Sequence, residues 1–171
     1  DLDKYPRQLA ADLDRLAGSV TGPVRLASVA SAAAALVSPA LLTLRREQPG
    51  ISVSVLAAEP MRSLELLLRD DVDIAVVDEY DYVPMAVPDP LQAHPLLTEE
   101  LVVVTRPDER PGPYRLAELA DRDWVMPPDE AACGLAVRSA CRAQGFEPRV
   151  VWETDDMLLL ARAVAAGHGI A

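Results

Sequence analysis

The stretch VVWETDDMLLLARAVAAGHGIA, residues 150–171, indicates the fold more clearly than any other part of the chain. Its first residues, 150–152, are β-branched or aromatic and predict a strand that ends within residues 153–155. The Met-, Leu- and Ala-rich residues that follow predict a helix ending at Gly-His-Gly, residues 167–169. A strand that stops where a helix begins directs unpaired backbone N–H groups toward one point. This arrangement suits the binding of a small polar ligand without a catalytic side chain.

The same order of strand, turn and helix recurs earlier in the chain, after Val29, Leu56 and Met126. In the first half, three β-branched or alternating segments predict strands, and two Leu- and Ala-rich segments between them predict helices. The order β-α-β-α-β implies a parallel sheet with helical crossovers. The predicted elements are strands at 24–29, 51–55 and 72–77, a helix at 32–48 with a kink at Pro39, and a helix that opens at Glu59-Pro60 with Leu64, Leu67 and Leu68 facing inward.

The second half repeats this topology without repeating its letters. Residues 78–95 carry four prolines and are predicted to be irregular, and residues 101–105 are predicted to be a strand that joins two lobes. Ligands in open α/β sheets bind at the carboxyl ends of strands, so two such lobes facing each other are expected to form a cleft. The further predicted elements are a helix at 116–119, a strand at 124–126, a turn at 127–130 and a helix ending at Gln144.

An apolar stripe with spacings of three and four residues precedes the first predicted strand and indicates a helix. Pro6 suits the first turn of that helix, and Gly18 and Gly22 end it. Two interpretations stay open: a helix that lies on its own domain, and a linker or dimerisation helix. The stripe consists of Leu2, Tyr5, Leu9, Leu13, Leu16 and Val20.

Composition limits the classes of function that the chain can have. The chain has 171 residues, of which 50% are hydrophobic, and a formal net charge of -11. So acidic a surface repels DNA phosphates, which argues against DNA binding by this stretch itself. No apolar run is long enough to span a bilayer, and the first residues, DLDKYPRQ, do not resemble a signal peptide, so the cytoplasm is the expected compartment.

Sequence motifs for chemistry are absent. The chain has no Gly-x-Ser-x-Gly elbow, P-loop or dinucleotide fingerprint. His94 and His168 are far apart, and no Cys/His cluster has metal-binding spacing. We therefore expect no catalytic residue, no metal ion and no cofactor.

Four segments in this order carry a family resemblance: GPVRLASVASAAAALVSPALLTLRREQPGISVSV, LLLRDDVDIAVV, LLTEELVVVTRP and LARAVAAGHGIA. They resemble the effector-binding domain of LysR-type transcriptional regulators, from about Gly22 to Ala171. The resemblance implies an α/β fold of the type II periplasmic-binding-protein kind, with two Rossmann-like lobes joined by crossover strands and preceded by a linker-helix stub. The expected divisions are a linker helix at 1–21, lobe I at 22–98 and lobe II at 99–171. It also implies that the last strand and helices of the domain follow Ala171.

The resemblance further implies a function. The chain is expected to bind a small metabolite in the cleft between the lobes and to control transcription allosterically, without being an enzyme. Promoter DNA would be bound only through a helix-turn-helix domain outside this chain, the protein would form a homodimer or homotetramer, and no membrane would be involved. Two alternatives remain: a solute-binding protein of a transporter, and an enzyme on the same fold. The apolar stripe before Gly22 favours the regulator.

The resemblance places effector contacts in the turns that follow the strands. Each of these residues also has a plain structural interpretation, such as helix capping for the serine, threonine and acidic residues. Pro60 departs from the serine or threonine that many relatives carry there, and a proline donates no hydrogen bond. The predicted effector-binding residues are Ser28, Ala30, Ser31, Glu59, Pro60, Asp78, Thr105, Pro128, Asp129 and Thr154.

Two smaller expectations concern charge and thiols. The turns are rich in Asp and Glu, which hints at a neutral or amine-bearing effector. Cys133 and Cys141 lie eight residues apart on one predicted helix, a rise of about 12 Å that is too long for a disulfide unless the helix unwinds. Although peroxide-sensing members of the family place redox cysteines in this region, buried structural thiols are the preferred interpretation.

Overall fold

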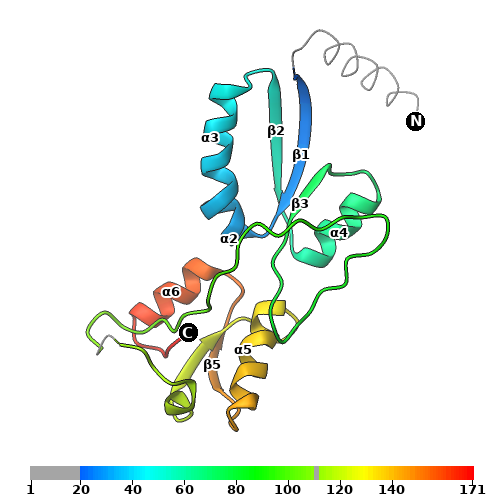
Figure 1. Cartoon of the computed structure of the whole chain (residues 1–171). Helices are drawn as coiled ribbons and strands as arrows, with labels where there is room; N and C mark the ends of the chain where they lie inside the picture. Colours follow the sequence, from blue (N-terminus) through cyan, green and yellow to red (C-terminus); the bar gives the residue numbers. More distant parts are fainter. Residues whose placement is uncertain (1–19, 110–111) are drawn as a thin grey trace. The chain divides into compact units, whose positions relative to one another are not determined.

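The computed structural model describes residues 20–109 and 112–171, and the chain divides into two compact units (Figure 1). The described part of the first unit is residues 20–78 with Val87–Gln92. The second unit contains Glu79–Ala86 and Ala93–Ala171. The predicted linker helix falls almost entirely on residues 1–19, outside the described residues.

The first unit is built on a three-stranded parallel sheet of order β2-β1-β3. Its strands are β1 (Gly22–Ser28), β2 (Ile51–Ala57) and β3 (Ile74–Val76). β1 pairs along its whole length with β2, and its last three residues pair with β3. The crossover from β1 to β2 and the one from β2 to β3 run in opposite directions across the sheet. Since parallel crossovers are right-handed, the intervening helices cover opposite faces of the sheet. The predicted β-α-β-α-β order is confirmed.

A continuous helical segment follows β1. It consists of α2 (Ala30–Ala32), a π-helical segment (Ala33–Val37) and α3 (Ser38–Glu47). The irregularity was predicted as a kink at Pro39, and the structure instead places it in the π-helical turn immediately before that proline. Proline donates no backbone hydrogen bond, so a change of hydrogen-bond register next to it disturbs the helix least.

Helix α4 (Pro60–Leu68) opens at Glu59-Pro60 as predicted. Leu64 and Leu66 are its buried leucines, whereas Leu68 is 48% exposed, so the prediction that Leu68 faces inward is wrong. Leu66 joins Ala27 of β1 and Val72 in a buried cluster. The register of the helix against β1, which the leucine spacing alone does not specify, selects Leu66.

The second unit repeats the topology. Its parallel strands are β4 (Asp123–Met126) and β5 (Arg149–Glu153), connected by α5 (Ala132–Ala143) and followed by α6 (Met157–Ala165). A short 3-10 helix (Leu116–Leu119) precedes β4. Ile170 forms a parallel bridge with Trp124, so the order is β5, β4, Ile170, matching β2, β1, β3 in the first unit. The predicted repeat of topology is confirmed.

Alternation along β4 distributes its side chains between two cores. Trp124 and Met126 pack with Cys141 of α5 and with Ile170. Val125 points the other way and packs with Leu160, Ala163 and Val164 of α6. The helices α5 and α6 therefore cover opposite faces of this sheet.

Two predicted strands differ from the structure. The strand predicted at 72–77 is only Ile74–Val76, because Val72 packs toward α4 and Asp73 is bound by Arg25. No strand is formed at 101–105, where Val104 and Ala171 alone exchange backbone hydrogen bonds of 2.6 and 3.0 Å. The segment has a sheet partner at one position only, which is too little for a ladder.

No helix within residues 20–109 and 112–171 combines the length and the hydrophobicity that a membrane crossing needs.

Candidate functional site

In the first unit, the turns after the three strands gather at one edge of the sheet. Ser28 is in register with Ala57 of β2 and with Val76 of β3, so all three strands end at the same level. Backbone hydrogen bonds continue past the strands: Val29 donates to the Val76 carbonyl at 3.2 Å, and Ala58 donates to the Ser28 carbonyl at 3.0 Å. The strand order reverses at β1, and ligands of doubly wound sheets bind outside the carboxyl ends of strands at such a point.

The two serines of the first turn are placed differently. Ser28 is fully buried, and its hydroxyl donates to the Val29 carbonyl at 3.0 Å. Ser31 lies on α2, immediately after Ala30, and both residues are exposed. Ala30 and Ser31 are therefore accessible from solvent at this edge, whereas Ser28 lies beneath the turn.

Glu59 and Pro60 open α4 at the same edge. Glu59 is exposed and is the N-cap residue, but its side chain forms no capping hydrogen bond. Pro60 is buried as the first helical residue. Sequence reasoning missed Ser63, which is fully buried and whose hydroxyl donates to the Ala58 carbonyl at 3.2 Å. The sequence feature that could have indicated Ser63 is its position one helical turn after Glu59, the first residue of the predicted helix. Asp78, the remaining predicted residue here, is half-buried two residues after β3.

The second unit has an edge of the same kind. Met126 of β4 is in register with Glu153 of β5, and the Thr154 backbone N–H donates to the Met126 carbonyl at 3.0 Å. Pro128 is half-buried and Asp129 is exposed in the turn after β4. The structure therefore brings Pro128, Asp129 and Thr154 to one edge.

Asp156 caps α6, whereas helix capping was the structural interpretation of Thr154 in the sequence. Its carboxylate accepts from the backbone N–H groups of Leu158 (2.8 Å) and Leu159 (3.1 Å). The Thr154 hydroxyl accepts from the Asp156 N–H at 3.1 Å and so fixes the turn that positions the cap. The half-buried Thr154 thus has a structural partner at this edge.

Thr105 lies away from the other predicted residues of its unit. The reciprocal bonds between Val104 and Ala171 mark an antiparallel pair, while Ile170 runs parallel to β4. Residues before Val104 therefore continue toward the carboxyl edge, and Thr105 lies on the side away from it.

Arg138 is the most unusual residue near the second edge, and sequence reasoning missed it. Its side chain is 8% exposed. Its guanidinium donates to the Pro127 carbonyl at 2.7 Å and to Glu153 at 2.9 Å. Its position four residues after Gly134 on the inward face of α5 was the only sequence signal.

The chemistry at both edges is that of polar backbone and small side chains. No group of three or more potential metal ligands occurs among the described residues. Burial raises the pKa of the Cys141 thiol to about 11, and Cys141 and Cys133 are not joined in a disulfide. Such a thiol is protonated at neutral pH and is a poor nucleophile.

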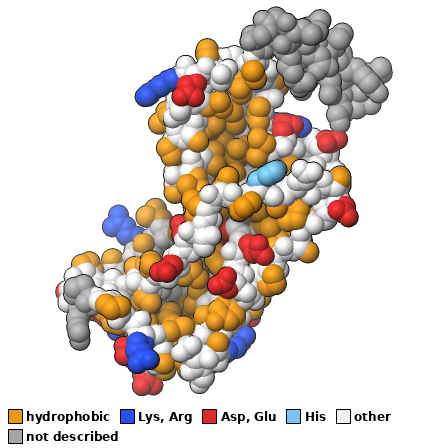
Figure 2. All heavy atoms as spheres, viewed as in Figure 1, with side chains coloured by type: hydrophobic (Ala, Val, Ile, Leu, Met, Phe, Trp, Pro, Cys, Tyr) orange, Lys and Arg blue, Asp and Glu red, His pale blue; other side chains and the backbone are white. Residues whose placement is uncertain are grey.

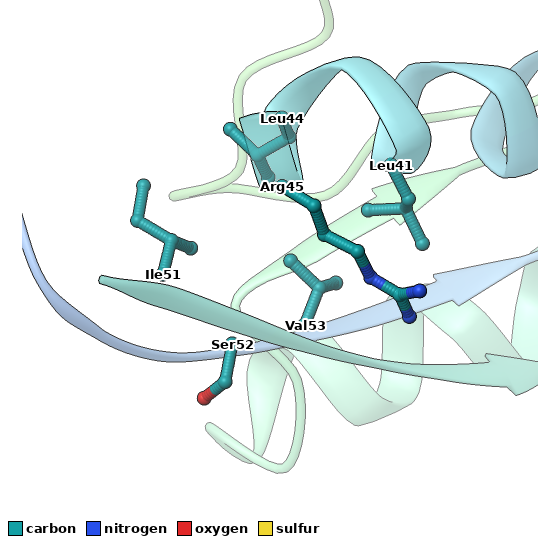
Figure 3. Close-up of a pocket in the computed structure, with 6 residues that line it drawn as sticks. All are labelled: Leu41, Leu44, Arg45, Ile51, Ser52 and Val53. Atoms are coloured by element: carbon teal, nitrogen blue, oxygen red, sulfur yellow. The ribbon is translucent and has the colours of Figure 1, made fainter. Parts of the chain in front are cut away.

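A shallow groove of about 220 Å³ lies elsewhere, between α3 and the edge strand β2 (Figure 3). Leu41, Leu44 and Arg45 of α3 point toward Ile51 and Val53 of β2, while Ser52 points away from them. Its β2 residues are at the amino-terminal half of the strand. The groove is therefore distinct from the carboxyl edge of the sheet.

The chain is similar to known proteins along most of its length. The family model for the LysR substrate binding domain matches residues 17–171. The small neutral protease regulatory protein of Streptomyces coelicolor is 30% identical over 151 residues, covering 84% of this chain and 46% of that protein. The chain spans about half the length of the curated relatives it matches.

Solved structures show the same fold. The C-terminal domain of a probable LysR family transcriptional regulator from Rhodococcus sp. RHA1 has a TM-score of 0.77 and 26% identity, covering 88% of this chain and 73% of that one. The regulatory domain of CcmR from Synechocystis PCC6803, in complex with 2-PG, has a TM-score of 0.73 and 23% identity, covering 88% and 71%. The fold is thus the expected periplasmic-binding-protein-like one. Because the family model spans nearly all of the described residues, this chain belongs to the LysR substrate-binding domain family.

Proposed function

We propose that this chain is the effector-sensing part of a LysR-type transcriptional regulator that works in the cytoplasm. The turns at the carboxyl edges of its sheets would contact a small metabolite, and binding would shift the population of conformations rather than start a reaction. The observation that carries the proposal is the pair of doubly wound sheets whose edges expose small and polar residues, in a chain of the LysR substrate-binding family.

Relatives support a metabolite as the effector. The CcmR regulatory domain has been solved in complex with 2-PG. In this chain Glu59 and Asp129 are exposed at the edges, and Asp78 is half-buried there. We infer that the effector is neutral or carries an amine, because these carboxylates would repel a negatively charged effector.

Control of transcription would be exerted through a DNA-binding part of the full-length regulator. The net charge of -11 supports this division of labour, since affinity for DNA depends largely on basic groups. The names of the relatives, which include HTH-type regulators, agree with it. The rival functions, a solute-binding protein and an enzyme on the same fold, have no comparable support.

A ligand screen tests the proposal. Thermal unfolding of the chain is followed with a metabolite panel of amino acids, amines, sugars and dicarboxylates, and native mass spectrometry identifies any co-purified compound. A neutral or amine compound should raise the midpoint of unfolding in a saturable way and remain chemically unchanged. Stabilisation by dicarboxylates alone would refute the inference about charge, and turnover of the compound would refute sensing without catalysis.

A matched pair of serine variants locates the site. Ser31→Ala removes an exposed hydroxyl at the first edge, and Ser54→Ala removes an exposed one in the middle of β2. We expect Ser31→Ala to weaken binding about ten-fold and Ser54→Ala to leave it unchanged. Equal affinities for both variants would place the effector elsewhere.

We also propose that the protein is a homodimer or homotetramer, and that a second copy covers the strip along α3 and β2. β2 is an edge strand, and edge strands pair readily with another chain. Leu42 of α3 and Val55 of β2 are 56% and 44% exposed there, and Leu36 of the preceding π-helical segment is 37% exposed. Figure 2 shows apolar side chains gathered on the viewed face of the first unit, in the region of α3 and β2.

A further inference from the structure

Arg138 carries a buried charge whose partners lie in the turn after β4, in α5 itself and at the end of β5. One guanidinium nitrogen, Nη1, donates to the Pro127 carbonyl at 2.7 Å and to the Gly134 carbonyl at 3.4 Å. The other, Nη2, donates to the Glu153 carboxylate at 2.9 Å. A buried charge is tolerated only where hydrogen bonds replace its water, so these contacts hold the guanidinium in one place.

Gly134 brings the first turn within reach of Arg138. It lies one helical turn before Arg138 and therefore on the same face of α5. A Cβ atom at Gly134 would lie 2.6 Å from the Pro127 carbonyl oxygen and still closer to that of Pro128. Only glycine lets the turn approach α5 this closely, and Arg138 then binds the carbonyl that the approach presents.

The second contact of Arg138 at this edge is at the end of β5. Glu153 is the last residue of β5, and its side chain is 52% exposed, so it sits at the surface of the edge. Thr154 follows and donates its N–H to the Met126 carbonyl at 3.0 Å. One buried side chain, on the helix that connects the two strands, thus contacts both the turn after β4 and the end of β5.

Residues of α5 other than Arg138 pack the helix against the sheet. The helix is anchored by Cys141, which packs with Trp124 and Met126 of β4, and by Val137. The bonds of Arg138 go instead to a turn carbonyl and to a half-exposed carboxylate, which are groups of the edge rather than of the core.

We propose that Arg138 is a positioning residue that holds the turn at 127–131 and the end of β5 at a fixed separation. The proposal rests on the proposed function only in treating these turns as effector contacts. The physical claim, local ordering of the two turns by one guanidinium, stands by itself and is measured without any ligand.

Amide hydrogen exchange of the full chain, followed residue by residue by NMR, tests the claim. The reporters are the Ala131 N–H, bonded to Pro128, and the Thr154 N–H, bonded to Met126. Arg138→Met removes the charge and all three hydrogen bonds of the guanidinium while keeping an unbranched side chain. We expect about ten-fold faster exchange or more at both reporters, with the Val125 N–H, bonded to Ile170 in the sheet centre, changed less than about two-fold.

Three further variants separate the contacts. Gly134→Ala displaces the first turn and should accelerate Ala131 but not Thr154. Glu153→Gln weakens only the ion pair and should accelerate Thr154 but not Ala131. Arg138→Lys keeps a donor and should rescue part of the protection at both reporters, which a loss of packing volume alone would not explain.

Acceleration of Val125 together with the reporters would show that Arg138 stabilises the whole unit, and unchanged exchange at the reporters would show that it orders nothing. Either result overturns the proposal. If Arg138→Met does not fold, Arg138→Lys decides by the same criterion. Failure to find an effector would contradict the proposed function but not this result, and the reverse also holds.

Discussion

Asp73 shows how a single carboxylate fixes the start of a strand. It accepts hydrogen bonds from the Arg25 backbone N–H at 2.7 Å and from the Arg25 guanidinium at 2.8 and 3.2 Å. The Asp73 N–H donates in return to the Arg25 carbonyl at 2.8 Å. Hydrogen bonding by the Arg25 side chain lowers the pKa of Asp73 below its ordinary value of 3.8.

We expect Asp73→Asn to destabilise the first unit at neutral pH by about 0.5–1 kcal/mol, a small value because both side chains are more than two-fifths exposed and solvent screens the pair. The folded pKa is depressed, so the stabilisation is present above the unfolded pKa and disappears as the pH falls through the folded pKa. The free energies of unfolding of the two proteins in urea should therefore differ at pH 7 and converge as the pH falls through the folded pKa of Asp73.

Glu65→Gln is the matched control, because Glu65 pairs with Arg62 on the surface of a helix with both side chains 54% exposed. It should change the free energy of unfolding by less than about 0.5 kcal/mol. A deficit in Asp73→Asn that persists undiminished at low pH would mean that charge is not the cause.

Residue patterns predicted which residues lie in the turns after the strands better than they predicted the burial and hydrogen bonds of each side chain. Ser28 and Ser31 look equivalent as letters, but one is buried in a hydrogen bond and the other is exposed. The role of Arg138 could not be predicted, because a lone arginine on a helix is usually solvated. Its partners, Pro127 and Glu153, are distant in sequence and are brought together only by the fold.

The helices α4, α5 and α6 end in the same way. In each, the residue after the C-cap has positive φ and donates three residues back, and the next residue donates five back. These are Schellman motifs. Gly145 and Gly167 occupy the positive-φ position in α5 and α6, but α4 has Asp70 there, with φ of 57°.

Asp70→Gly should therefore stabilise the first unit, by about 0.5–1 kcal/mol, because glycine adopts the left-handed conformation without the steric cost of a Cβ atom. Chemical denaturation measures the change. Asp70→Asn serves as the control for the loss of charge and should give a smaller gain. A loss of stability in Asp70→Gly, with Asp70→Asn unchanged, would show that contacts of the Asp70 side chain outweigh its backbone conformation.

Element types were predictable because turn chemistry and hydrophobic period agree along most of the chain. Gly145 and the Glu59-Pro60 pair mark helix ends that the structure confirms. The π-helical turn at Ala33–Val37 was not predictable, since its five apolar residues have no sequence feature that distinguishes it from an α-helical turn. The prediction of a strand at 101–105 is wrong because β-branched residues indicate only a propensity for extended structure, whereas a strand also needs a partner along its length.

At the scale of the molecule, the repeated doubly wound topology was predictable from the order of elements, since right-handed crossovers leave few arrangements. The assignment of residues 79–92 to units was not. Glu79–Ala86 belongs with the second unit and Val87–Gln92 with the first, and this proline-rich stretch has no periodicity that separates them. Contacts that are distant in sequence decide such boundaries.

The strip along α3 and β2 gives a prediction for the whole molecule. Leu42 is 56% exposed on α3 and lines a second groove, next to the one in Figure 3, together with Val55 and Arg45. Leu42→Glu places a carboxylate where a second copy is proposed to bury apolar surface, so self-association should weaken at least about ten-fold. Leu68→Glu makes the same change at a leucine that is 48% exposed on α4, which covers the other face of the sheet, and should have no effect. Sedimentation velocity over a range of concentrations distinguishes these outcomes.

A shift toward monomer in both variants would indicate a general effect of added negative charge on a chain that already carries a net charge of -11. A shift in Leu68→Glu alone would move the interface to the face covered by α4.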